Sequence, residues 1–344
     1  MLFSSFSVKN LTLKNRIVMP PMCMYCANLD GTVTDWHVIH YATRAVGQVG
    51  LLIVESTAVA PEGRLTNSDL GLWDDRQVDG LKRLVEAVLA NGSRIGIQLN
   101  HGGRKSHVAG QPLLAPSPIA FNAKYGTPKE MTRDDIKGVV ESFAQAASRA
   151  VRAGFDLIEI HAAHGYLLSQ FLSPLSNQRE DEYGGSPANR ARLLGEVVEA
   201  VQSVLPSGMP LLVRVSAHDF EAGGNTPQDV AEMINTVKHK GIDVVDVSSG
   251  AVTETVPRAY PGYQIPFALT IRERTNLPVI GGGLITEPMQ ALRVVKSGVD
   301  LVYIGRELLR NPYWPLKAAY LLGQNIEWPA QYIRGKFPTQ LHEN

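Results

Sequence analysis

The chain has 344 residues, of which 44% are hydrophobic, and its 33 Lys and Arg balance 33 Asp and Glu to a formal net charge of zero. This balance removes the electrostatic argument for a nucleic acid or an anionic membrane as partner. No apolar run approaches the length of a transmembrane helix, and the N-terminus lacks the pattern of a signal peptide. The only cysteines, Cys23 and Cys26, lie in one short loop, which argues against a disulfide scaffold and for a cytoplasmic protein.

Eight short apolar runs, rich in β-branched residues, predict strands along the chain. They cover residues 17–20, 51–56, 94–100, 156–163, 211–217, 244–250, 278–283 and 301–306. Helical patterns with capping sequences lie between most of these runs. Thr132 begins a long helix that ends near Gly154. Thr226 begins a second helix, and Thr286 begins a third that closes at residues 296–298.

Eight strands that alternate with helices, without a linker or a break in composition, predict a single α/β domain over residues 1–344. The architecture that fits best is a closed (β/α)8 TIM barrel, and a doubly wound sheet is the alternative. Residues 101–129, rich in Gly, Pro and Ala, are expected to form a long loop over the barrel top. The tail after Pro312 continues past the eighth unit.

Polar side chains occupy inward-facing positions near the ends of several predicted strands. In a barrel the active site lies at the carboxyl ends of the strands, and alternate residues face the interior. Stepping back by two from the strand ends selects Glu55, Thr57, Gln98, Asn100, Glu159, His161, Arg214, Ser216, Asp246 and Ser248. Because buried charges need partners, one hypothesis pairs Arg214 with Glu159 on the neighbouring strand. A ligand site explains this collection, and a structural ion-pair network is the alternative.

Glycine-rich sequences end the seventh and eighth predicted strands. Residues 281–283 are three glycines, and Gly305 precedes Arg306. Barrels form phosphate sites at these places, since glycine N–H groups can approach an anion closely and arginine can add a bidentate contact. The placement predicts a ligand with a phosphate tail, although glycine also serves tight turns.

The fourth predicted strand ends in the pattern His161-Ala-Ala-His164-Gly-Tyr166. Two histidines at this spacing could be metal ligands or core residues, but the Glu of a helical H-E-x-x-H motif is missing, and no metal is expected. Two imidazole N–H donors could instead hold one carbonyl oxygen, with the Tyr166 hydroxyl as proton donor.

The Cys23/Cys26 pair has the spacing of a redox dithiol. That motif opens a helix in the thioredoxin fold, whereas here it follows the first predicted strand. A dithiol mechanism is therefore a minor alternative, and a buried inert thiol remains an alternative for Cys26.

Several segments of the chain resemble the old yellow enzyme family. They are residues 21–25 (Pro-Met-Cys-Met-Tyr), 161–166, 171–177 and 181–190, and the likeness runs essentially end to end. Within the family the chain is similar to the shorter bacterial class of NADPH dehydrogenases and xenobiotic reductases. The resemblance implies an ene-reductase with tightly bound, non-covalent FMN. Such an enzyme takes hydride from NADPH or NADH and delivers it to Cβ of an α,β-unsaturated carbonyl.

The resemblance also implies roles for individual residues. The cofactor contacts would be Pro21, Met22, Cys23, Ala58, Gln98, Arg214, Gly283, Gly305 and Arg306, the last three at the phosphate. His161 and His164 would hold the carbonyl oxygen of the substrate, and Tyr166 would protonate Cα. Cys23 would tune the flavin potential, and Tyr25 would line the substrate pocket. The resemblance puts Lys105 close to the active site without an assigned role, and Cys26 also has none.

Two other functions remain open from the residues alone. One is another barrel enzyme with a phosphate-tailed cofactor or a phosphorylated substrate, such as an isomerase or an aldolase. The other is a flavin- or phosphate-binding sensor without turnover.

The tail, residues 313–344, is expected to lie at a subunit interface. Its aromatic residues, Trp314, Trp328, Tyr332 and Phe337, suit a buried interface better than a solvated tail. We expect a homodimer, or a homotetramer built from dimers, in which Arg334 reaches the substrate site of the neighbouring subunit. The resemblance supplies the same idea. The alternative is a tail that folds back on its own barrel, with Arg334 in a surface ion pair.

Overall fold

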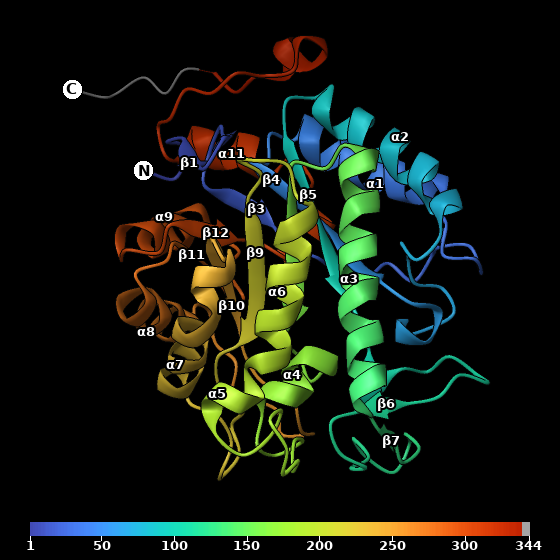
Figure 1. Ribbon diagram of the computed structural model, residues 1–344. Helices are drawn as coiled ribbons and strands as arrows, with labels where there is room; N and C mark the ends of the chain where they lie inside the picture. The colour runs from blue at the N-terminus through green and yellow to red at the C-terminus, as the bar shows by residue number, and fades with distance from the viewer. Residues whose placement is uncertain (339–344) are drawn as a thin grey trace.

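The computed structural model describes residues 1–338, so residues 339–344 of the predicted interface tail lie outside the described part. Eight parallel strands close into a barrel at the centre of the molecule (Figure 1). In order around the barrel they are β3 (Ile17–Met19), β4 (Leu51–Ala58), β5 (Arg94–Asn100), β8 (Leu157–Ala162), β9 (Leu211–Ser216), β10 (Val244–Ser248), β11 (Val279–Gly281) and β12 (Leu301–Tyr303). Each predicted strand is confirmed, and the doubly wound alternative is wrong.

Helices follow the strands and cover the outside of the barrel (Figure 1). They are α1 (Asp35–Val46), α2 (Val78–Leu89), α3 (Arg133–Ala153), α6 (Arg192–Val204), α7 (Pro227–Val237), α8 (Ile265–Thr275), α9 (Pro288–Lys296) and α10 (Arg306–Arg310). Short helices α4 (Leu167–Leu172) and α5 (Pro187–Arg190) extend the connection after β8. Helix α11 (Trp314–Leu321) follows the eighth unit.

Two predicted capping boxes are present. Thr132 Oγ1 accepts a hydrogen bond from the Asp135 N–H at 3.1 Å, and α3 ends at Gly154 with φ of 91°. Thr226 caps α7 in the same way. The third predicted start was one residue early, because Glu287 rather than Thr286 is the N-cap of α9. Pro288 at the first helical position excludes helical backbone angles for the residue before it.

Inside the barrel, side chains change from apolar to polar along β8, β9 and β10. The apolar layers include Val18, Ile53, Leu157, Leu212, Val244 and Ile280. The antiparallel hairpin of β1 (Phe6–Val8) and β2 (Leu11–Leu13) packs Leu11 and Leu13 against the same cluster. Two residues further along β8, β9 and β10 the interior positions are Glu159, Arg214 and Asp246. The prediction that Glu55 faces the interior is wrong, because the register between β4 and β5 shifts after Val54 and the Glu55 carboxyl contacts His37 of α1. The apolar end is therefore a packed core, and the polar carboxyl end is available for a site.

The connections divide between the two ends of the barrel (Figure 1). At the carboxyl end lie α4, α5 and the short parallel pair β6 (Leu114–Ala115) and β7 (Lys129–Glu130), which organises part of the predicted long loop. At the opposite end lie the N-terminus, β1, α11 and the tail as far as residue 338. Within residues 1–338, no helix has the length and apolar character needed to cross a membrane.

Candidate active site at the carboxyl end of the barrel

A left-handed turn after β8 brings His161, His164 and Tyr166 together. His164 has φ of 57°, and a Cβ on the next residue, Gly165, would collide with the carbonyl oxygen of Ala251, so this turn requires glycine. The imidazole centroids of His161 and His164 are 5.1 Å apart with planes at 86°. The Tyr166 ring lies edge-on to His161 at 5.0 Å. The three residues thus form one cluster.

The hydrogen bonds of the two histidines favour one pair of tautomers. The Ala163 N–H donates to His161 Nδ1 at 3.1 Å, which leaves the ring proton on Nε2. Ser248 Oγ accepts from Gln264 Nε2 at 3.2 Å and lies 2.7 Å from His164 Nε2, so its own proton is free to point at that nitrogen. The proton of His164 then belongs on Nδ1, 3.4 Å from His161 Nε2. Two N–H donors therefore face one small space, which suits a carbonyl oxygen.

The electrostatic surroundings keep all three groups neutral. Burial lowers the pKa of His161 and of His164 well below the usual value, and the charges of Arg214 and Lys105 add to this effect. Burial also raises the pKa of the Tyr166 hydroxyl well above its usual value. At neutral pH the histidines are hydrogen-bond donors without charge, and the phenol keeps a proton to give. Within residues 1–338, no three His, Cys, Asp or Glu side chains are grouped as metal ligands would be.

Lys105 connects the histidine turn to the loop after β10. Its Nζ donates to the carbonyl oxygen of His164 at 2.9 Å and to that of Ala251 at 3.0 Å. The same Nζ lies 5.2 Å from the centroid of the Tyr166 ring. Burial, with a smaller contribution from Arg104, lowers the pKa of Lys105 to about 8. Lys105 is therefore part of the site, holding the turn that carries His164.

Cys23 and Tyr25 lie on the loop after β3. Glu55 of β4 holds this loop through a hydrogen bond. The Met24 N–H donates to Glu55 Oε2 at 2.7 Å. Tyr25 has φ of 52°, and its side chain is 54% exposed. Burial, together with the carboxyls of Glu55 and Asp69, raises the pKa of the Cys23 thiol. Cys23 therefore stays a neutral thiol, and Tyr25 is largely exposed on the same loop.

Cys26 belongs to a separate cluster behind this loop. Its Sγ lies 3.6 Å from His37 Nε2, which in turn lies 3.4 Å from Glu55 Oε1. Both cysteines are free thiols. Cys26 thus packs against the residues that anchor the loop, and Cys23 lies on the loop itself.

Arg214 pairs with Asp246 and not with Glu159, contrary to the pairing hypothesis. Arg214 Nε lies 3.2 Å from Asp246 Oδ2. Strand register explains this choice, because Arg214 is directly opposite Asp246 on β10, whereas on β8 it is opposite His161. Glu159 instead accepts a hydrogen bond from Gln98 Nε2 at 2.8 Å. Ala58, fully buried, ends β4 beside β5, which carries Gln98.

The predicted phosphate residues share one cavity. Gly283, Gly305 and Arg306 line a space of about 230 Å³ after β11 and β12, together with Ser248 and Tyr263. Gly283 has φ of 107°, a conformation that favours glycine. Backbone N–H groups, hydroxyls and an exposed guanidinium are the donors that a phosphate requires, so the residues present fit the phosphate tail of a flavin mononucleotide.

The loop after β3 reaches this phosphate cavity. A Cβ built on Gly305 would lie 3.5 Å from Met22 Sδ, so the segment with Pro21 and Met22 packs against the end of the eighth strand. Ser248 lines the cavity and also contacts His164. The phosphate cavity and the histidine cluster are therefore two parts of one site.

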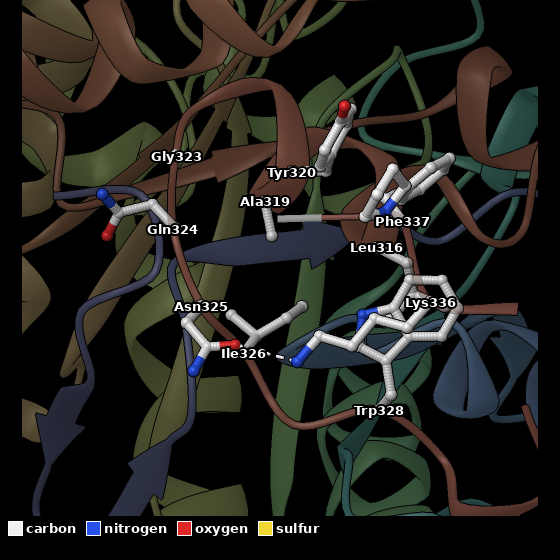
Figure 2. Close-up of a pocket in the computed structure, with 11 residues that line it drawn as sticks. Leu316, Ala319, Tyr320, Gly323, Gln324, Asn325, Ile326, Trp328, Lys336 and Phe337 are labelled. Carbon is white, nitrogen blue, oxygen red and sulfur yellow. Dashed lines mark hydrogen bonds between the residues drawn. The ribbon is translucent and has the colours of Figure 1, made fainter. Parts of the chain in front are cut away.

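Arg334 lies apart from these residues in this chain. It belongs to the short 3-10 helix Ala330–Gly335, at the opposite end of the barrel (Figure 1). Figure 2 shows Trp328 and Phe337 of the tail beside Tyr320 of α11, and the ring centroids of Phe337 and Tyr320 are 4.6 Å apart. The tail thus packs on the far face of its own barrel, and Arg334 is exposed there.

Trp314 differs from the other aromatic residues of the tail. It is only 3% exposed, and its Nε1 donates to the carbonyl oxygen of Thr286. The expectation that Trp314 suits a subunit interface is therefore wrong, because its ring is already buried in its own chain. Tyr332 and Phe337 stay 43% and 38% exposed.

Two residues of the site, Gln264 and Tyr303, were not predicted from the sequence. Gln264 donates to Ser248 Oγ and, at 2.9 Å, to Ser249 Oγ, and the Tyr303 hydroxyl bonds to Gln264 Oε1. Tyr303 follows Leu301 at an interior position of β12, so the two-residue stepping could have found it. Gln264 lies in the irregular loop before α8, where no periodic signal exists.

The chain is similar to known proteins over almost its whole length. The NADH:flavin oxidoreductase / NADH oxidase family matches residues 1–325. NADPH dehydrogenase of Geobacillus thermodenitrificans (strain NG80-2) is 56% identical over 336 residues, which cover 97% of this chain and 98% of that protein. NADPH dehydrogenase of Geobacillus sp. (strain WCH70) is 55% identical over 337 residues, with the same coverage of both chains.

Solved structures share the fold. Morphinone reductase in complex with tetrahydroNAD superposes with a TM-score of 0.79 at 31% identity, covering 95% of this chain and 92% of that chain. A 2-naphthoyl-CoA reductase complex reaches a TM-score of 0.87 at 24% identity; the match covers 94% of this chain and 52% of that longer chain, and it shows the fold alone. From the family match, the full-length relatives and the barrel with its phosphate cavity, we conclude that the chain belongs to the NADH:flavin oxidoreductase / NADH oxidase family, the old yellow enzyme family, and is an FMN-dependent oxidoreductase.

Proposed function

We propose that this oxidoreductase is an ene-reductase, which reduces the activated C=C bond of α,β-unsaturated carbonyl compounds with electrons from NADPH or NADH. The observation that carries the proposal is the pair of neutral N–H donors on His161 and His164 beside the protonated Tyr166. The two histidines can bind a carbonyl oxygen, and Tyr166 can donate a proton. The reduction of an enone needs both groups, whereas the oxidation of NAD(P)H needs neither. The family assignment favours this function over an isomerase, an aldolase or a non-catalytic sensor.

The cofactor would be held along the carboxyl end of the barrel. Its ring would contact Pro21, Met22, Cys23, Ala58, Gln98 and Arg214, and its phosphate would bind Gly283, Gly305 and Arg306. FMN, bound without a covalent link, supplies hydride transfer between the nicotinamide and the alkene. The neutral thiol of Cys23 would adjust its potential without acting as a nucleophile.

The substrate would lie between the histidines and the loop after β3. His161 and His164 would each donate a hydrogen bond to its carbonyl oxygen, which polarises the double bond so that Cβ accepts hydride. Tyr166 would then protonate Cα from its hydroxyl, a role that its neutral state at pH 7 permits. Tyr25, partly exposed at the opening, would contact the substrate from the other side.

The names of the relatives point to NADPH as the hydride donor, since the proteins at 55% and 56% identity are both named NADPH dehydrogenase. Morphinone reductase, which shares the fold, was solved in complex with tetrahydroNAD. Nicotinamide and enone would use the same opening in turn.

We further propose that residues 1–344 act as one FMN-binding domain whose tail, 313–344, completes the site of a second subunit in a dimer or a dimer-based tetramer. Arg334 cannot serve its own site from the opposite end of the barrel. Exposed apolar side chains offer places for a partner, because Leu29 is 79% exposed, and Trp36 and Ile39 of α1 are 56% and 58% exposed.

Anaerobic half-reactions test the proposed function. The purified protein should carry about one FMN per chain, lose flavin absorbance on adding NADPH, and regain it on adding an enone, with ping-pong kinetics overall. Reduction by the nicotinamide without reoxidation by any enone of a broad panel would reject the ene-reductase assignment. Intersecting double-reciprocal lines would reject a single shared site.

A further inference from the structure

Four polar residues from consecutive strands form a buried layer directly inside the candidate site. Gln98 of β5, Glu159 of β8, Arg214 of β9 and Asp246 of β10 are 1%, 0%, 7% and 0% exposed. We call this set the interior polar layer. The layer holds one cation, Arg214, and two carboxyl groups. Within residues 1–338, Asp246 forms an ion pair with Arg214, and Glu159 forms no ion pair.

Charge balance argues against two ionised carboxylates in this layer. One guanidinium can neutralise one carboxylate, so a second ionised group would leave an unpaired negative charge away from solvent. A fully buried carboxyl in that position takes up a proton instead.

The hydrogen bonds point to the same conclusion. Gln98 Nε2 donates to Glu159 Oε1, but no donor of residues 1–338 serves Glu159 Oε2 or completes a well-aligned bond to either oxygen of Asp246. Glu159 and Asp246 lie within hydrogen-bonding reach of each other. Two ionised carboxylates are both acceptors and repel, whereas one proton between them turns the contact into a hydrogen bond.

We propose that Glu159 and Asp246 hold a single proton, carried by Glu159. Neutral Glu159 then accepts from Gln98 and donates to Asp246, and Asp246 is the ionised partner of Arg214. Burial, followed by the charge of Asp246, raises the pKa of Glu159 well above its usual value. Burial raises the pKa of Asp246 as well, and the charge of Arg214 opposes that effect. Because Arg214 forms its ion pair with Asp246, Asp246 is the carboxyl that ionises.

The other titratable groups that face the layer add no charge to it. Burial raises the pKa of Tyr303, whose ring lies 5.7 Å from the Arg214 guanidinium, and of Cys23. Burial lowers the pKa of His161, the neighbour of Arg214 across the β8–β9 pair. All three groups are neutral at pH 7, and the layer as a whole has no net charge.

Glu159 is therefore a positioning residue. It touches neither substrate nor cofactor in the proposed arrangement, but it fixes the amide of Gln98 and, through Asp246, the guanidinium of Arg214. This consequence rests on the proposed cofactor contacts of Gln98 and Arg214, whereas the shared proton itself rests only on the geometry of the layer.

Infrared spectroscopy of the purified protein in H2O and D2O tests the shared proton. The wild type should show, at neutral pH, a C=O stretching component of a buried, protonated carboxylic acid that shifts in D2O. Glu159→Gln should abolish this component. Asp246→Asn should also abolish it, because the remaining glutamate then ionises beside Arg214.

Glu55→Gln is the matched control, since Glu55 is a second buried glutamate, outside the layer. The control should leave the Glu159 component in place and remove only a component that disappears as the pH rises through about 8, the pKa to which burial raises Glu55.

Stability and FMN binding provide an independent measurement. Glu159→Gln replaces a neutral acid with a neutral amide, so the melting temperature should stay within about 2 °C and the FMN Kd within about threefold of the wild type. Asp246→Asn breaks the ion pair with Arg214 and forces Glu159 to ionise in place of Asp246, so it should lower the melting temperature by about 5 to 10 °C.

Several results would overturn the proposal. They are an acid component that survives in Glu159→Gln, a Glu159→Gln protein that fails to fold while Glu55→Gln folds, and loss of stability that is larger for Glu159→Gln than for Asp246→Asn. The infrared component does not depend on turnover. A protein with the component but without enone reduction would reject the proposed function and leave the shared proton intact.

Discussion

Ser248 Oγ lies 2.7 Å from Nε2 of His164, and the same hydroxyl accepts a hydrogen bond from Gln264. Because Gln264 fills an acceptor site of the hydroxyl, the Ser248 proton is directed to the imidazole, and the ring proton of His164 is placed on the nitrogen that faces His161. Ser248 thus determines which nitrogen of His164 carries the proton that would bind the substrate. The same residue lines the phosphate cavity.

Removing this hydroxyl should weaken substrate binding. Ser248→Ala frees His164 to adopt the other tautomer, and we expect the KM for an enone to rise about three- to tenfold, the value of one hydrogen bond. Steady-state kinetics with saturating NADPH measure the change. Ser249→Ala is the matched control, since Ser249 also bonds to Gln264 and has no hydrogen bond to His164. Equal effects of the two variants would show that Ser248 acts only through Gln264.

Replacing His161 or His164 should reduce turnover more than replacing Ser248. His161→Ala and His164→Ala each remove one donor to the substrate oxygen, and we expect turnover with enones to fall by about 10²–10³. FMN content should stay at the wild-type level, because the phosphate cavity is untouched. Metal analysis of each variant provides the control, and loss of a stoichiometric metal together with activity would favour the metal-ligand alternative.

Tyr166→Phe should separate the two half-reactions. The change removes the proton donor for Cα but leaves the ring that packs against His161. Stopped-flow measurements should show flavin reduction by NADPH within about twofold of the wild type and reoxidation by an enone slowed by about 10² or more. Similar slowing of both half-reactions would contradict the role as proton donor.

Glu55 should make stability depend on pH. Burial raises its pKa from 4.5 to about 8, so between these values the folded state binds more protons than the unfolded state. The stability that Glu55 contributes is thus complete below pH 4.5 and is lost as the pH rises through about 8. From pH 5 to pH 8 the melting temperature of the wild type should fall relative to that of Glu55→Gln. A constant difference between the two proteins would contradict the raised pKa.

Subunit exchange tests whether Arg334 acts in trans. Arg334→Ala and Tyr166→Phe should each be nearly inactive alone. In a mixed dimer one site carries both changes and the other is intact, so about half of the wild-type activity per dimer should return. Lys336→Ala, which alters another tail cation, should keep activity by itself. No recovery in samples shown to contain mixed dimers would reject action in trans.

Local sequence patterns were sufficient to predict the barrel and most of the candidate site residues. Strand and helix periodicities and capping boxes are local properties, so residues 94–100 and the helix start at Thr132 could be read directly. The alternation of strand side chains also placed His161 and Arg214 in the interior, because side chains alternate regularly along β8 and β9, whereas the register shift in β4 defeated the same rule for Glu55.

Which of these residues contact one another depends on the three-dimensional fold. Arg214 pairs with Asp246 because of the register between β9 and β10, and register is set by contacts between segments distant in sequence. The contact of Gln264 with Ser248 depends on the path of an irregular loop, which has no periodic pattern. The same holds for Trp314, whose burial under its own chain follows from how the tail packs after the barrel has closed.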